Sequence, residues 1–207
     1  MFKTISIIVL SLVVGCISAG HSVEPPVPAP QPSETVYVHF DTTLPPTFSV
    51  ERCMSQCRAM YARWNIEFVV AKTLREIPEG ATSMTVWNTH HILDTPGMDG
   101  YLLGMASGID EMNANDEPLA GNGFFGVFAG AVREVAGHAF PDEPFPEAKV
   151  SDITGKVLGH EVGHLLGLWH VHTDRPYFMA VGGPPPWDRT LWSITSRLYL
   201  DTVLGRR

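Results

Sequence analysis

Two histidines and a glutamate stand close together in the last third of the chain, in a segment patterned as a helix. His160 and His164 are four residues apart, and Glu161 directly follows the first of them. Residues four apart on a helix share one side, so both imidazoles can reach one metal ion at about 2.0–2.1 Å. Glu161 is rotated about a quarter turn away, which leaves its carboxylate beside the ion, where it can accept a proton from water. We therefore interpret the histidines as metal ligands and Glu161 as a general base.

A glycine and a third histidine complete this constellation. Gly167 lies three residues after His164, and glycine can adopt the positive φ that ends a helix and reverses the chain. The reversal brings His170 towards the same ion. Three neutral imidazoles leave a fourth position for water, which is typical of a catalytic zinc site. We predict that His160, His164 and His170 bind one catalytic Zn²⁺, with His172 as a rival third ligand that breaks this spacing.

The string HEVGHLLGLWH matches HExxHxxGxxH, and through it the chain resembles the metzincin metallopeptidases. The resemblance implies a zinc endopeptidase in which Glu161 activates the water that attacks an extended peptide or protein substrate. It also implies a methionine turn beneath the zinc, for which Met179 is the candidate. Some metzincins have a tyrosine ligand two residues after this methionine, but Val181 occupies that position here. Val171, the residue after the third histidine, does not assign a subfamily.

Two other functions are compatible with the same residues. One is a catalytically silent binding module displayed at the cell surface, although such a module would not need the carboxylate of Glu161. The other is a zinc amidase that acts on cell-wall peptide. In the peptidase interpretation, residues 184–192, which include Trp187, follow the methionine turn and are expected to line the pocket for the substrate side chain after the scissile bond.

The rest of the chain must supply a scaffold for these residues. Alternating or continuous apolar residues predict strands at residues 36–40, 65–71, 82–88, 101–107 and 123–130. Helical spacing predicts helices at residues 50–64, capped by Ser49, from Ser151 or Asp152 through the histidines, and from about Asp188.

These elements predict an α+β fold. The resemblance implies a twisted mixed sheet packed on the active-site helix, with the zinc cleft between an upper part and a smaller lower part. The resemblance implies that the edge strand at residues 101–107 pairs with the backbone of the substrate.

The N-terminus has the pattern of an export signal over residues 1–20. Lys3 is followed by an apolar stretch and then by small residues. The sequence ending at Cys16 resembles the bacterial lipobox, which predicts acylation of this cysteine and a lipoprotein of the cell envelope. The alternative is an ordinary signal cleaved near Ala19 or Gly20, which would give a secreted or periplasmic protein.

A proline-rich linker separates this signal from the folded part. Residues 21–33 contain five prolines, which favour an extended spacer. We assign residues 34–207 to one metzincin-like catalytic domain and see no room for a folded inhibitory pro-segment before it.

The charge of the chain limits its partners. The formal net charge is −8 and no run of Lys and Arg occurs, so we predict no nucleic-acid partner and no membrane contact beyond the lipid anchor. We expect the chain to act as a monomer. The acidic segment 110–117 offers oxygens to calcium but lacks the glycine and spacing of an EF-hand, so a solvated loop is the better interpretation.

The remaining cysteines and histidines have structural interpretations. Cys53 and Cys57 are four residues apart on a predicted helix, where their Cβ atoms would be about 6 Å apart. They form either a strained disulfide or two buried thiols. Surface or strand-end roles are expected for four further histidines: His39, His90, His91 and His138.

Overall fold

The computed structural model describes residues 34–89, 91–92, 101–106, 126–139, 146–172, 174–181, 185 and 188–207. The predicted signal, the linker and the acidic segment 110–117 lie outside these residues. The elements are, in chain order, β1 Glu34–Phe40, α1 Val50–Met60, β2 Ile66–Ala71, a 3-10 turn Leu74–Glu76, β3 Ser83–Trp87, β4 His91–Ile92, β5 Tyr101–Leu102, β6 Gly104–Met105, β7 Gly126–Phe128, α2 Ala129–Ala139, α3 Glu147–Leu165, β8 Val171–His172, β9 Ala180–Val181 and α4 Ile194–Val203.

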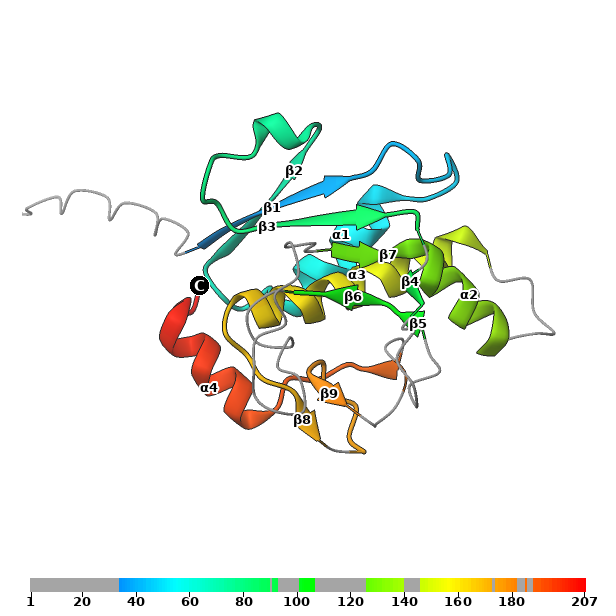
Figure 1. Ribbon diagram of the computed structural model, residues 1–207. Helices are drawn as coiled ribbons and strands as arrows, with labels where there is room; N and C mark the ends of the chain where they lie inside the picture. Colours follow the sequence, from blue (N-terminus) through cyan, green and yellow to red (C-terminus); the bar gives the residue numbers. More distant parts are fainter. Residues whose placement is uncertain are drawn as a thin grey trace, which may run out of the picture.

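The main sheet has five strands in the order β2-β1-β3-β7-β6 (Figure 1). The first four strands are parallel, whereas β6 at the edge runs antiparallel to β7. Val36 and Val38 of β1 are fully buried, as expected for a strand with neighbours on both edges. The predicted mixed sheet is therefore confirmed, and Figure 1 shows α1 and α3 beneath it, with β8, β9 and α4 further below.

Helix α3, which carries the predicted ligands, is held in place by close packing against α1. A Cβ at Gly155 would overlap the carbonyl oxygen of Cys53, and one at Gly159 would overlap the sulfur of Met60. Glycine at these positions lets the two helices approach closely. The Tyr61 hydroxyl, at the end of α1, also donates a hydrogen bond to the Gly159 carbonyl at 2.7 Å. This contact fixes α3 one residue before its first histidine.

Two predicted helix boundaries were wrong, because α1 is shorter and α3 is longer than predicted. Helix α1 ends at Met60, because Trp64 packs edge-on against Trp192 instead of continuing the helix. Helix α3 begins at Glu147, so the predicted cap at Ser151 lies one turn inside it. The Ser151 hydroxyl donates to the Glu147 carbonyl and accepts from the Ser49 backbone N–H, and so joins α3 to the start of α1.

The segment between the sheet and α3 also differs from the prediction. The strand expected at residues 123–130 is described as β7 only at Gly126–Phe128, and α2 starts directly after it. The strand expected at residues 101–107 is divided between β5, which pairs with β4, and β6, which pairs with β7. The last helix starts at Ile194, capped by the Ser193 hydroxyl, and not near Asp188.

Cys53 and Cys57 are two free, fully buried thiols on α1, and burial raises the pKa of both. Of the two alternatives, the structure therefore has the thiols and not the disulfide. The ring Nδ1 of His39 lies 3.3 Å from the Ala71 carbonyl oxygen, which is the strand-end role expected of it. Among the described helices, none is long and apolar enough to cross a membrane.

Candidate metal centre

The three predicted ligands meet at one point. The Nε2 atoms of His160, His164 and His170 form a triangle with sides of 3.1 Å. For comparison, ligand nitrogens at about 2.0–2.1 Å from a tetrahedral zinc lie about 3.3–3.4 Å from one another. Within the described residues, these histidines form the single group of three or more candidate ligands close enough to share a metal ion.

The hydrogen bonds of two of these rings determine which nitrogen faces the centre. His160 Nδ1 lies 2.6 Å from the Phe178 carbonyl oxygen, and His164 Nδ1 lies 2.8 Å from the Leu168 carbonyl oxygen. A carbonyl only accepts, so each Nδ1 must carry the proton and each neutral ring keeps the Nε2 lone pair. Lone pairs 3.1 Å apart repel each other unless a cation lies between them. The donor set, three imidazoles with oriented rings, fits zinc.

The surroundings of His160 favour the neutral form that a metal requires. Burial lowers the pKa of this histidine to about 3, and the neighbouring His164 and His170 add to the effect. The ring therefore stays uncharged at neutral pH. A neutral imidazole is the ligand form, because protonation would block the lone pair.

A tight turn after α3 carries His170 back to the helix. Gly167 has φ of +90°, and its N–H donates to the His164 carbonyl at 2.8 Å. The next residue, Leu168, donates its N–H to the Gly163 carbonyl at 2.9 Å. This is the reversal that the sequence predicted for Gly167, and a side chain there would also overlap the hydroxyl of Tyr199.

Met179, the candidate for the methionine turn, packs against α3. Its side chain is buried, and its sulfur lies against Gly163, where an added Cβ would be 2.7 Å away. Gly163 directly precedes His164 on α3. The preceding residue in the turn, Phe178, supplies the carbonyl that orients His160. The turn at Met179 thus places a buried sulfur beside α3 and supplies the hydrogen-bond acceptor of His160.

The carboxylate of Glu161 is buried between α3 and the edge of the sheet. Its side chain lies against Gly104 of β6, where a Cβ would be only 2.6 Å from Oε1. Glycine at this position leaves room for the carboxylate beside the strand. The sequence prediction included β6 as an edge strand but missed Gly104, because no local pattern links it to α3.

Arg189 is a second residue that sequence reasoning missed. Its guanidinium is half-buried, and its charge acts on both Glu161 and His160. Burial lowers the pKa of Arg189, whereas Glu161 opposes that shift. The following residues, Thr190 and Leu191, donate their N–H groups to the Pro176 carbonyl, which joins this segment to the residues just before Met179. Arg189 does fall within residues 184–192, the segment expected to line a pocket.

Other histidines are not part of the described cluster. His138 is exposed at the end of α2, while His90 and the side chains of His91 and His172 lie outside the described structure. The structure thus places His170 in the cluster and leaves the side chain of His172 undescribed.

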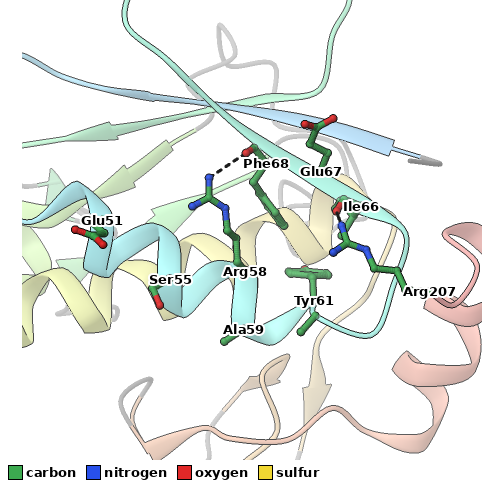
Figure 2. Close-up of a pocket in the computed structure, with 10 residues that line it drawn as sticks. Glu51, Ser55, Arg58, Ala59, Tyr61, Ile66, Glu67, Phe68 and Arg207 are labelled. Atoms are coloured by element: carbon green, nitrogen blue, oxygen red, sulfur yellow. Dashed lines mark hydrogen bonds between the residues drawn. The ribbon is translucent and has the colours of Figure 1, made fainter. Parts of the chain in front are cut away.

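A cavity of about 660 Å³ lies at the opposite edge of the sheet, beside β2 (Figure 2). Arg58 of α1 donates a hydrogen bond to the Phe68 carbonyl at 3.1 Å, and Arg207 donates to the Ile66 carbonyl. Figure 2 shows both arginines pointing at β2. They occupy backbone acceptors of this edge strand, which limits pairing with another chain there.

Comparison with known proteins shows similarity of fold. A scan against protein-family models finds no match, and a search of curated proteins finds none. The structure is similar to that of a zinc-dependent peptidase from Methanocorpusculum labreanum, with a TM-score of 0.54 and 15% identity over 80% of this chain and 99% of that one. An archaemetzincin from Methanopyrus kandleri gives a TM-score of 0.47 and 18% identity over 84% of this chain and 97% of that one. The chain has the fold of a zinc-dependent peptidase and brings three histidines together within it.

Proposed function

We propose that this protein is a zinc endopeptidase of the metzincin type. The observation that carries the proposal is the triangle of three imidazole Nε2 atoms, two of them held by carbonyls with their lone pairs inward, beside the buried carboxylate of Glu161. His160, His164 and His170 would hold Zn²⁺. When bound, the ion would polarise the scissile carbonyl and make a water molecule more acidic.

The residues of the chain perform the proton transfers. Glu161 accepts a proton from the attacking water and then delivers it to the leaving amine. Its neighbour Arg189 carries the opposite charge and is attracted to the Glu161 carboxylate. Since Glu161 is buried, few waters compete for its carboxylate.

The edge strand β6 positions the substrate. An extended peptide can add to an exposed sheet edge through main-chain hydrogen bonds, with its side chains in pockets. The edge formed by β6 lies directly against Glu161, whereas the opposite edge, β2, has carbonyls occupied by Arg58 and Arg207. A peptide paired with β6 would therefore pass beside both the general base and the histidines.

The test combines cleavage and metal analysis on the full chain. Wild-type protein with zinc is incubated with a mixed peptide library, and cut sites are mapped by mass spectrometry. Glu161→Gln is nearly isosteric and leaves the histidines in place, so it should retain close to one zinc per chain while turnover falls by roughly 10²- to 10⁴-fold. Loss of zinc in Glu161→Gln, or full activity retained by it, would contradict the proposal.

Two further arms separate the alternatives. His170→Ala should lose most of the zinc, whereas His172→Ala should keep it, because His170 lies within the cluster. Cell-wall fragments incubated in parallel test the amidase. If zinc binds but neither peptides nor cell-wall fragments are cut, the silent binding module becomes the better interpretation.

A further inference from the structure

One face of the molecule is apolar although it is not part of the core. It consists of Trp169, from the turn after α3, and four residues of α4: Ile194, Leu198, Tyr199 and Val203. Trp169, Ile194 and Leu198 are each more than 60% exposed, at 63%, 66% and 61%. We call this set the α4 face. Trp169, Ile194 and Tyr199 line one groove of about 650 Å³, which places the turn and the helix side by side. His170 also lines this groove, so the α4 face borders the histidine cluster.

The fold does not explain these exposed side chains. The side of α4 that packs on the domain is formed by Ser196 and Leu200, followed by Leu204. Ile194 and Leu198 lie one turn apart on the outward side, where a helix in contact with water normally carries polar residues. An exposed apolar set of this kind marks a surface that binds something.

The charge around the α4 face differs in sign from that of the whole chain. Residues 189–207 contain four arginines and one aspartate, although the whole chain has a net charge of −8. Two of these arginines are engaged elsewhere, because Arg189 lies near Glu161 and Arg207 donates to the Ile66 carbonyl of β2. Arg197 is exposed on α4 itself, and Arg206 is exposed just beyond it. The lone acidic group, Asp201, accepts hydrogen bonds from Arg206 and Trp64. Arg206 and Asp201 thus offset each other, and the exposed Arg197 is the positive charge that α4 itself places beside the apolar side chains, which favours an anionic surface.

We propose that the α4 face rests on the surface of an anionic lipid bilayer. This contact goes beyond the proposed peptidase activity, and it departs from the expectation, based on the charge of the whole chain, that the lipid anchor is the sole membrane contact. Leu198 and Ile194 would enter the boundary between headgroups and acyl chains. Trp169 and Tyr199 suit the headgroup level, where amphipathic rings are favoured. Arg197 would meet a lipid phosphate.

The entry point of the chain supports this partner. β1 begins at Glu34, paired with Ile66, and the Ile66 carbonyl accepts a hydrogen bond from Arg207. The chain therefore enters the domain beside its C-terminus, near the end of α4 (Figure 1). An acyl group on Cys16, which the sequence predicts, would therefore attach the domain to the membrane on the side where α4 ends. A single acyl chain holds a protein to a membrane only marginally, so a second contact from the α4 face would make the attachment stable.

The test uses Trp169 as a local probe in the full chain carrying Cys16→Ser, which removes the predicted acylation site. Vesicles contain phosphatidylcholine with or without phosphatidylglycerol, and their acyl chains are brominated to quench nearby tryptophans. Brominated anionic vesicles should quench part of the tryptophan fluorescence of the protein. In Trp169→Phe this quenching should be lost, because the tryptophan that enters the bilayer is gone. Any binding through the apolar N-terminal stretch alone would leave Trp169 unquenched, so the two contacts are separable.

The matched variants compare the α4 face with Leu74, an exposed apolar residue elsewhere on the surface. Ile194→Ser with Leu198→Ser should weaken binding to anionic vesicles by about tenfold or more, because both side chains would lose their apolar contact. Leu74→Ser, at a site that is 55% exposed near β2, should change nothing. All variants should unfold at the same temperature as wild type.

Three outcomes would overturn the proposal. Trp169 could remain unquenched on bound vesicles, or the double variant could bind as wild type. The third outcome is a wild-type chain that self-associates without vesicles and a double variant that is monomeric, which would make the α4 face a protein interface. Since the assay needs neither zinc nor peptide, its result is independent of the proposed peptidase activity.

Discussion

Replacing Gly104 by alanine tests whether the Glu161 carboxylate must stay where β6 leaves room for it. An added Cβ would lie 2.6 Å from Oε1 of Glu161, 2.7 Å from Cγ and 2.8 Å from Cδ. Carbon atoms in favourable contact are about 3.5–4.0 Å apart, so one of the two groups must move by roughly 1 Å. The carboxylate will move, because it is the end of a side chain that can rotate.

The expected effect is large on turnover and small on stability and metal binding. The backbone of β6 can keep its pairing with β7, so the free energy of unfolding should fall by only about 1 kcal/mol. His160 and His164 remain held by the Phe178 and Leu168 carbonyls, so zinc content should stay near that of wild type. A base misplaced by about 1 Å should lower kcat/KM by about 10²-fold.

The assay measures kcat/KM on a cleaved peptide, zinc per chain, and urea unfolding for Gly104→Ala and a neighbour. Gly126→Ala is the matched control, because its Cβ would lie 2.6 Å from the backbone oxygen of Thr85, which cannot rotate away. That variant should mainly lose stability. Wild-type kcat/KM in Gly104→Ala would refute the reasoning, as would loss of its zinc.

Three further predictions concern location, acid stability and helix packing. Labelled palmitate should enter the wild-type protein in a bacterial host but not Cys16→Ala; release of both forms unlabelled would exclude the lipid anchor. In metal-free protein, the His160 ring takes up a proton near pH 6.5 when the chain is unfolded, whereas in the folded chain its pKa is about 3. Stability should therefore fall as the pH drops through this window, by up to about 1.4 kcal/mol per pH unit, and urea unfolding of His160→Asn should show a flatter dependence. Tyr61→Phe removes the hydrogen bond to Gly159 and should cost about 1 kcal/mol in thermal unfolding, and an unchanged midpoint would contradict that contact.

The grouping of the three histidines could be predicted from sequence because the geometry is local. His160 and His164 are set by one helical turn, and Gly167 reverses the chain within three residues. Neither feature depends on distant parts of the protein. The same holds for the alternation in β1 and β2, whose strand positions were predicted to within two residues.

The missed features depend on contacts between distant segments. Gly104 and Glu161 are far apart in the chain, and glycine has no chemistry that would mark it as part of a site. Trp64 fits a helical pattern but is taken into a cluster with Trp192. Ser151 is a good cap residue, yet its hydroxyl bonds the start of α1 while the helix begins one turn earlier. In each case tertiary packing decided between two locally acceptable structures.

The two edges of the sheet show why the site lies where it does. A parallel sheet leaves backbone groups unsatisfied at both of its edges, and either edge would be a template for another strand. At β2, Arg58 and Arg207 donate to carbonyls of the strand and so compete with a peptide for the same acceptors. At β6 the strand is antiparallel to its neighbour, and the glycine next to Glu161 keeps the side chain of the strand itself out of the space beside the carboxylate. In the proposed function, an extended peptide would pair with β6, the edge that borders Glu161. A substitution that closes this edge should therefore remove the proposed activity while leaving His160, His164 and His170 unchanged.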